Sequence, residues 1–266
     1  MVPLQPRGCE GLVLGQRFGQ HFLTRKSILN RIAEAAIPSS PSVMIEIGAG
    51  RGALTESLLD VCDRVIAIEV DTVLVHYLRQ KFVTAISEGR LEIVEGDVLK
   101  TDFAVLGNNP SIVGNLPYYI TSPILEKVFS LGAQHWARAV FLVQAEVAAR
   151  ITAVPGTRDF GYLTVLAQTH AHTELLFPVP AEAFRPPPKV ESAVVRLLPR
   201  QPEFADTAGF LRFAQVCFRH KRKTLRNNLL EAYPAERVNG LAEAKLRAEQ
   251  LSVSQLADLY RRLQVA

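Results

Sequence analysis

The sequence predicts an α/β protein: a parallel sheet with helices on both faces, followed by a small all-helical C-terminal domain. Between residues 27 and 198, short β-branched apolar runs alternate with stretches whose apolar residues recur at helical spacing. Strands that are apolar on both sides are typical of a parallel sheet that is covered on both faces. After Pro199 only the helical spacing continues, so we place a domain boundary there, dividing the chain into residues 1–200 and 201–266.

The predicted elements alternate along the chain. A first helix is predicted over residues 27–37. Strands are then predicted over 43–48, 64–70, 91–97, 111–115, 138–144 and 190–198. The helices between them cover 53–60, 71–82, 122–132 and 145–151. In the C-terminal part, helical spacing covers 207–218, 222–231, 242–250 and 254–263.

Composition narrows the class of protein. The 266 residues are 48% hydrophobic, enough for a large core, and the net charge is +4. No apolar run approaches the roughly 18 residues of a membrane span, and the N-terminus does not resemble a signal peptide. The three cysteines are widely spaced, which fits reduced thiols. We expect a cytoplasmic monomer that does not bind a membrane.

Glycines and acids follow three successive predicted strands. Gly48, Gly50 and Gly52 follow the first strand, Glu69 ends the second, and Asp97 follows the third. Carboxyl ends of parallel strands meet at one edge, where such sheets bind ligands. Carboxylates there can accept hydrogen bonds from the ribose hydroxyls and the adenine amino group of an adenosine cofactor. The loop also satisfies the dinucleotide fingerprint through Ala53, and a purely structural turn is the third interpretation.

An additional acid favours one interpretation of the glycine loop over the others. Glu46 lies two residues before the first glycine. The methionine end of S-adenosylmethionine carries an ammonium group, which a carboxylate would attract, whereas a dinucleotide carries a pyrophosphate, which it would repel. The sequence therefore favours S-adenosylmethionine as the cofactor.

A polar amide stands at the end of the fourth strand, in the stretch Asn115-Leu116-Pro117-Tyr118. The Asn115 side-chain oxygen and the Leu116 carbonyl can accept both hydrogens of an exocyclic amino group and aim its lone pair. Pro117 fixes the backbone direction, and the ring of Tyr118 offers a surface on which a base can stack. The alternative is a cap or turn at Asn115 with Tyr118 in the core.

These motifs together resemble a known family, the small-subunit (16S) rRNA adenine N6,N6-dimethyltransferases, which are related to the erythromycin-resistance rRNA methyltransferases and to the mitochondrial dimethyltransferases. The resemblance covers nearly the whole chain. It rests on the ordered series RFGQHFL, IEIGAGRGALT, AIEVD, GDVLK, VGNLPYYITSPIL, FLVQAEVAARI, AFRPPPKVESAVVRL and FRHKRKTLRNNL.

The resemblance implies a Rossmann-like class I methyltransferase sheet. It also implies that S-adenosylmethionine is used to dimethylate two adjacent adenosines in the 3′-terminal hairpin loop of 16S rRNA, within the small (30S) ribosomal subunit during its biogenesis. His21 and Leu23 would line the cofactor site together with Gly48, Gly50, Glu69, Asp97 and Asn115. Phe184 would hold the flipped adenine opposite Tyr118.

The positive charge of the chain is local. Residues 207–230 contain six Lys or Arg and no acid, so the rest of the chain carries a net charge of −2. Five of the six lie within residues 219–226, and we expect them to contact RNA phosphates: Arg219, Lys221, Arg222, Lys223 and Arg226. The alternative is a solvated helix face. His170 and His172 have no partners in sequence that would complete a metal site, and we expect no metal.

Three rival functions remain open. A large-subunit rRNA methyltransferase that confers antibiotic resistance would share the Asn115 corner, although Leu116, rather than Ile, favours the small-subunit enzyme. A nucleotide-binding dehydrogenase would have no use for the basic segment. An assembly factor without activity would not need Asn115 and Tyr118 intact.

Overall fold

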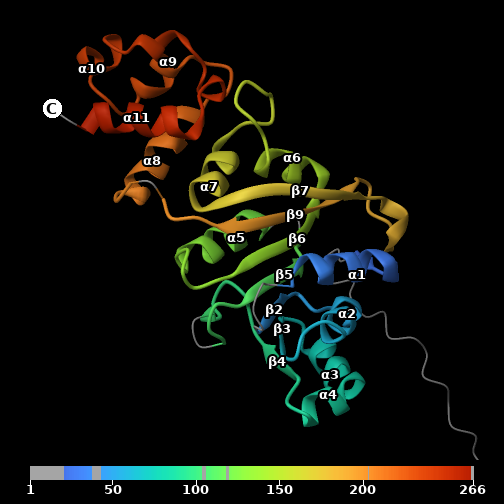
Figure 1. Cartoon of the computed structure of the whole chain (residues 1–266). Helices are drawn as coiled ribbons and strands as arrows, with labels where there is room; N and C mark the ends of the chain where they lie inside the picture. The colour runs from blue at the N-terminus through green and yellow to red at the C-terminus, as the bar shows by residue number, and fades with distance from the viewer. Residues whose placement is uncertain (1–20, 38–42, 104–105, 118–119, 203, 265–266) are drawn as a thin grey trace, which may run out of the picture.

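A seven-stranded sheet forms the middle of the molecule (Figure 1). The computed structural model describes residues 21–37, 43–103, 106–117, 120–202 and 204–264. Across the sheet, the strands stand in the order β4 (Leu91–Glu95), β3 (Val65–Glu69), β2 (Met44–Ile47), β5 (Ser111–Asn115), β6 (Arg138–Gln144), β9 (Ser192–Pro199) and β7 (Ala171–Val179).

The sheet is mixed, which corrects the expectation of a parallel sheet. The strands from β4 to β6 run parallel, but β9 pairs antiparallel with both β6 and β7. Strand β7 was not predicted. It lies at the edge of the sheet, where Pro178 is tolerated and several side chains face solvent, so the apolar run that indicates a buried strand is missing.

Two hydrophobic cores cover the two faces of the sheet. On one face, α1 (Lys26–Ala35) and α2 (Ala53–Leu59) pack through Ile32 and Leu58 against alternate strand residues such as Met44. On the other face, α5 (Thr121–Ser130), α6 (Ala145–Ile151) and α7 (Tyr162–His170) pack against the residues between them, such as Ile45. Because side chains alternate along a strand, one short apolar run supplies both cores.

Two further helices join the parallel strands β3 and β4. Asp71 caps the N-terminus of helix α3 (Thr72–Lys81), because its side chain accepts hydrogen bonds from the backbone N–H groups of Val73 and Leu74. It is followed after Phe82 by α4 (Val83–Ser87), which was not predicted, because the predicted helix ends at residue 82. Within the described ranges, none of the helices has the length and apolar character needed to cross a bilayer.

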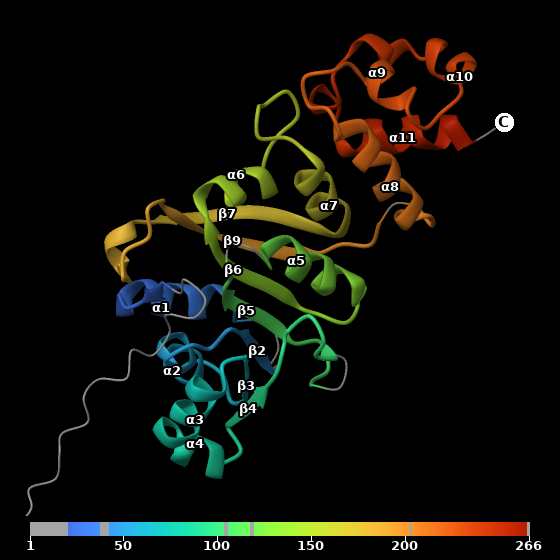
Figure 2. The same ribbon diagram turned by 180° about the vertical axis from the view of Figure 1, so that it is seen from behind.

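The C-terminal part is helical in the residues that the structure describes, and it packs beyond α7 and β7 (Figures 1 and 2). It contains α8 (Thr207–Phe218), α9 (Leu225–Leu229), α10 (Ala235–Asn239) and α11 (Val253–Gln264). The stretch predicted as helix over 242–250 forms two short 3-10 helices, η5 (Ala242–Lys245) and η6 (Ala248–Gln250).

A third core joins these helices to the first part of the chain. Phe160 and Val165, which precede residue 200, pack in the same buried cluster as Phe213 and Leu256. Strand β9 ends at Pro199 and α8 begins at Thr207, so the connection is short. The C-terminal helices are therefore anchored on α7 and on the loop that precedes it.

Candidate active site

The carboxyl ends of β2, β3, β4 and β5 surround one cavity of about 580 Å³. The sequence-predicted residues that line it are His21, Leu23, Gly48, Gly50, Glu69, Asp97, Asn115, Leu116 and Pro117. They come from five separate stretches of the chain, and the parallel register of β2 with β3 and β5 brings those stretches together. The structure thus places these residues at one site; Tyr118 lies outside the described residues.

Glu69 is fixed by the backbone around it. One carboxylate oxygen accepts from the Gly50 N–H at 2.8 Å, and the other accepts from Val70 N–H at 2.9 Å and Asp71 N–H at 3.0 Å. The side chain is only 3% exposed, yet it lines the cavity. These bonds join the glycine loop after β2 to the end of β3, and they hold the carboxylate in one orientation toward a ligand.

The glycine loop leaves room for a ligand beside the Glu69 carboxylate. Gly48 has a φ of 72°, in the left-handed region, and a Cβ built on it would meet no atom within 4 Å. Gly52 has a φ of 75° and sits at the start of α2, where a Cβ would lie 2.4 Å from the ring of Phe82. Because Gly48 has no side chain, the space beside it in the cavity stays open to a ligand. The missing side chain of Gly52 lets α2 pack closely on α3.

Glu46 is the most buried acid of the cavity wall. It is 1% exposed, and Thr55 donates a hydrogen bond from Oγ1 to its Oε2 at 2.5 Å. Burial raises the pKa of Glu46 to about 7, and the neighbouring Glu69 also raises it, whereas Thr55 and Lys81 lower it. A cation bound in the cavity would compensate for the burial of this charge, so the wall fits a ligand with an ammonium group.

The amide of Asn115 is held in one orientation. Its Nδ2 donates to the backbone carbonyl of His21 at 3.1 Å. A carbonyl can only accept, so the amide nitrogen must face it, and Oδ1 is left to accept elsewhere. Asn115 is half-buried and lines the cavity. The segment around His21 thus fixes which way the Asn115 amide faces.

A short two-stranded ribbon carries that segment. Strand β1 (Phe22–Leu23) pairs antiparallel with β8 (Phe184–Arg185), so that Leu23 stands opposite Phe184 and Phe22 opposite Arg185. The His21 ring nitrogen Nδ1 lies 2.8 Å from the Pro186 carbonyl. Two stretches more than 150 residues apart are thereby joined at the rim of the cavity.

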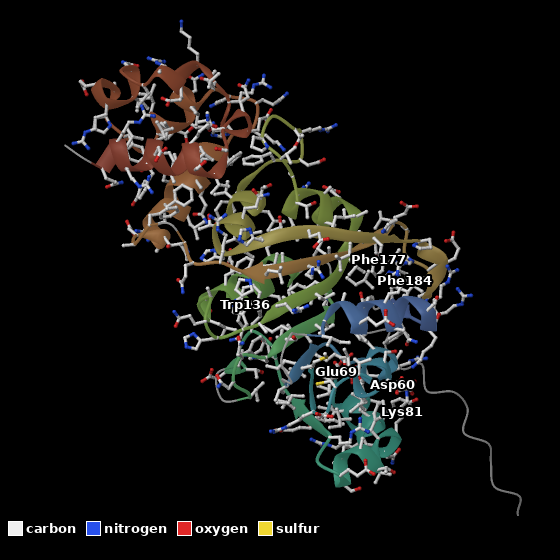
Figure 3. All side chains as sticks on the ribbon, viewed as in Figure 1. Asp60, Glu69, Lys81, Trp136, Phe177 and Phe184 are labelled. Atoms are coloured by element: carbon white, nitrogen blue, oxygen red, sulfur yellow. The ribbon has the colours of Figure 1, made fainter. Side chains whose placement is uncertain are left out.

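The placement of Phe184 does not fit the expected adenine clamp. Its ring is 1% exposed and packs in the core beside Leu23, and it lies near Phe177 at the edge of the sheet by α1 (Figure 3). Of the two β8 residues, Arg185 lines the cavity instead. Alternation along β8 explains this outcome, since successive side chains point to opposite sides. Sequence reasoning missed Arg185, although it directly follows the aromatic residue.

The predicted basic segment lies apart from the cavity, and none of its residues is among the described residues that line it. It mostly forms the exposed turn between α8 and α9 rather than a helix face. An acid from just outside the segment partly offsets its charge: Glu231 pairs with Arg219 at 2.9 Å, and that bond holds the Glu231 pKa below its ordinary value. Lys221 donates to the Arg158 carbonyl, and Arg226 donates to Asn239 at 2.8 Å.

Known proteins match both the sequence and the fold. A sequence model of the family described as "Ribosomal RNA adenine dimethylase" matches residues 14–265. The "Ribosomal RNA small subunit methyltransferase A" of Shewanella pealeana is 42% identical over 247 residues, covering 90% of this chain and 91% of the relative. The protein of the same name from Chlorobium luteolum is 38% identical, covering 95% of this chain and 91% of the relative.

Two solved structures share the architecture over most of the chain. A dimethyladenosine transferase from Plasmodium falciparum superposes with a TM-score of 0.76 at 28% identity, covering 90% of this chain and 96% of that one. The 23S rRNA methyltransferase ErmE superposes with a TM-score of 0.70, also at 28% identity, covering 91% and 99%. With the family model matching nearly from end to end, this chain belongs to the ribosomal RNA adenine dimethylase family.

Proposed function

We propose that this protein transfers methyl groups from S-adenosylmethionine to the N6 amino groups of two adjacent adenosines in the 3′-terminal hairpin loop of 16S rRNA, within the small ribosomal subunit. Each adenosine would receive two methyl groups. The observation that carries the proposal is the convergence of Gly48, Glu69 and Asn115 on one cavity, with the Asn115 amide oriented by the His21 carbonyl. The relatives named for small-subunit methylation support the choice of substrate.

The cavity fits the proposed cofactor in both shape and charge. Gly48 leaves space at the wall, Glu69 presents a fixed carboxylate for ribose hydroxyls, and Asp97 lines the same cavity. The carboxylate of Glu46 lies where an ammonium group would stabilise its ionised form. When bound, S-adenosylmethionine supplies a methyl group that is already activated for transfer.

The chain would then contribute alignment rather than a covalent intermediate. An adenine amino group is a poor nucleophile because its lone pair is delocalised into the ring. Asn115 Oδ1 and the Leu116 carbonyl would accept its two hydrogens and direct the lone pair toward the methyl group. Positioning of this kind accounts for much of the rate in group transfer. The adenine must leave its stack to reach the corner, and a loop makes this easier than a duplex would.

RNA would be held by two further parts of the chain. We propose that residues 1–200 form the catalytic domain and that residues 201–266 form a helical RNA-binding domain, whose exposed Arg222 and Lys223 contact phosphates. Tyr118 is proposed to stack on the adenine. The buried ring of Phe184 gives no support to a second stacking surface. We further propose that the protein acts as a monomer in the cytoplasm.

The test is to incubate the protein with unmethylated small subunits and labelled S-adenosylmethionine, and then to map the modified nucleosides. We expect N6,N6-dimethyladenosine at two adjacent positions near the 3′ end of the small-subunit rRNA. Large subunits serve as the control substrate, because the ErmE structure shares the fold. Label on the large subunit alone would contradict the proposed substrate, and label on neither subunit would contradict the proposed activity.

A further inference from the structure

The β1–β8 ribbon has two different faces. In an antiparallel ribbon, residues that stand opposite each other point to the same side, and successive pairs point to opposite sides. The pair formed by Leu23 and Phe184 is buried in the core. The pair formed by Phe22 and Arg185 therefore faces the other way, and both of these residues line the active-site cavity. One face of the ribbon thus presents an aromatic ring and a guanidinium group to the cavity.

A second arginine lies beside the same ring. Arg51, in the glycine loop, has its guanidinium carbon 4.7 Å from the centroid of the Phe22 ring, and it also lines the cavity. The ring packs closely on the loop, because a Cβ built on Gly50 would lie 3.1 Å from it. Arg51 and Arg185 are thus both neighbours of Phe22 at the cavity. Two cations that adjoin one ring repel each other, and an anion bound there would offset this repulsion.

The guanidinium group of Arg185 is held by the backbone but is not neutralised. Its Nη1 donates to the carbonyl of Phe184 at 3.0 Å and to the carbonyl of Glu182 at 3.3 Å. Arg185 is exposed, and within the described ranges it makes no ion pair, while its Nε and Nη2 have no acceptor. The two carbonyls restrict the side chain, so that less freedom is lost when its remaining donors bind a ligand. The planar guanidinium group matches two oxygens of a phosphate.

The position of the ribbon favours an anion from the RNA over one from the cofactor. In the sheet, β3 and β4 lie on one side of β2, and β5 lies on the other. Glu69 ends β3 and Asp97 follows β4, so the acids proposed for the ribose and adenine of the cofactor are on the first side. The ribbon is joined to β5 instead, because the His21 carbonyl next to β1 accepts from Asn115. Arg185 therefore belongs to the part of the site where the substrate amine is proposed to react.

We propose that Arg185 binds a backbone phosphate of the RNA strand next to the adenosine that enters the cavity, and that Arg51 adds positive charge beside it. A nucleotide that leaves its stack brings its own phosphates to the mouth of the cavity, because base and phosphate are covalently joined. Phosphate contacts fix the position of a strand without reading its sequence. This inference rests on the proposed function, since it assigns a further contact with the same RNA substrate at the same site.

The test measures binding of the full chain, saturated with S-adenosylhomocysteine, to unmethylated small subunits at several salt concentrations. We expect Arg185→Gln to weaken binding about tenfold, the effect of one charged hydrogen-bonded contact. The slope of log K against log salt should fall by about 0.7, the value for one phosphate of a single strand. Arg185→Lys keeps the charge and should keep the slope. Arg64→Gln is the matched control, because Arg64 is also exposed but precedes β3, at the end of the strands away from the cavity.

Calorimetry with S-adenosylhomocysteine separates the RNA phosphate from the carboxylate of the cofactor. We expect Arg185→Gln to bind S-adenosylhomocysteine within about twofold of the unmodified chain. Binding that is about tenfold weaker would assign Arg185 to the cofactor and overturn the proposal. An unchanged affinity and slope for small subunits would also refute it. Methyl transfer by the unmodified chain keeps the two proposals apart: transfer without the Arg185 effect contradicts only this inference, and the Arg185 effect without transfer contradicts only the proposed activity.

Discussion

Asn115 and His21 lie 94 residues apart, yet the Asn115 side chain donates from Nδ2 to the His21 backbone carbonyl at 3.1 Å. This bond turns Oδ1 away from the His21 carbonyl, as the proposed acceptor of a substrate amine requires. It also makes the orientation of the amide depend on the β1–β8 ribbon. The first and seventh stretches of the motif series, RFGQHFL and AFRPPPKVESAVVRL, are therefore joined beside the Asn115 amide.

Replacing Asn115 tests this relationship directly. We expect Asn115→Ala to lower methyl transfer at least 100-fold, because the amine loses an aligned acceptor, while RNA binding stays within about twofold. Asn115→Asp should be nearly as inactive, since a carboxylate oxygen would face the His21 carbonyl. Single-turnover transfer and filter binding measure the two effects. Asn108→Ala, at an exposed amide before the same strand, is the control. Substantial turnover in the Ala variant would eliminate the proposed role.

The three N–H groups that converge on Glu69 lead to a second prediction. Glu69→Gln replaces one acceptor oxygen by a donor, so at least one backbone N–H loses its partner. We expect S-adenosylhomocysteine binding to weaken 10- to 100-fold in calorimetry, and the free energy of unfolding to fall by about 1–3 kcal/mol. Glu92→Gln, on the exposed side of the neighbouring strand, should change neither quantity beyond a few tenths of a kcal/mol. Unchanged cofactor binding in Glu69→Gln would remove the carboxylate from the cofactor site.

The raised pKa of Glu46 predicts a pH dependence of stability. Its pKa is about 7 in the folded chain against an ordinary 4.5, so between these values the folded state holds a proton that the unfolded state has lost. Stability from this group is then lost as pH rises, by up to about 3 kcal/mol between pH 4.5 and 7. Urea unfolding should show this loss in the unmodified chain and not in Glu46→Gln. Parallel pH profiles of the two proteins would contradict the assignment.

The same group predicts a proton release when the cofactor binds. A cation near the Glu46 carboxylate favours its ionised form, so affinity for S-adenosylmethionine should rise from pH 5.5 to 8, and binding near pH 6.5 should release a proton. Calorimetry in buffers of different ionisation enthalpy measures this release. We expect it to disappear in Glu46→Gln. Release that persists in the variant would point to another titrating group.

Much of this architecture could be predicted because the apolar pattern of the single strands agrees with the way in which parallel strands are arranged in a sheet. The strands β2, β3, β5 and β6 are mostly apolar runs, which predict buried strands. When such strands run parallel, the residues at their carboxyl ends lie next to one another. That reasoning placed Glu69, Asp97 and Asn115 at one cavity. The bond from Asn115 to His21 could not be foreseen, because it depends on a ribbon of only two residues in each strand.

Other features escaped prediction for physical reasons. Strand β7 lies at an edge and carries exposed polar side chains, so its signal was weak, and its antiparallel pairing with β9 made the sheet mixed. The family resemblance implied that Phe184 displays its ring, but the alternation along β8 buries the ring and turns Arg185 to the cavity. The pairing of Arg219 with Glu231 became visible only when the turn between α8 and α9 was placed.

The C-terminal helices are held together by a bond between Tyr260 on α11 and Asp206 at the start of α8. The Tyr260 hydroxyl donates to Asp206 Oδ2 at 2.5 Å, and Asp206 Oδ1 accepts from the Gly209 N–H at 2.8 Å. We expect Tyr260→Phe to lower the melting temperature by a few degrees, because the ring still packs while the hydroxyl contact is lost. Tyr77→Phe, which removes an exposed hydroxyl from α3, should leave the melting temperature unchanged.

The basic turn yields a prediction that separates RNA binding from chemistry. Arg222→Ala and Lys223→Ala each remove an exposed cation far from the cavity, so each should reduce the salt dependence of RNA affinity by about one unit of slope in log K against log salt. Single-turnover methyl transfer at saturating RNA should stay within about twofold, because neither residue lines the site. Lys100→Ala removes an exposed cation that follows β4; it is the matched control and should leave the slope intact. A slope unchanged in all three variants would mean that the phosphates are held elsewhere on the chain.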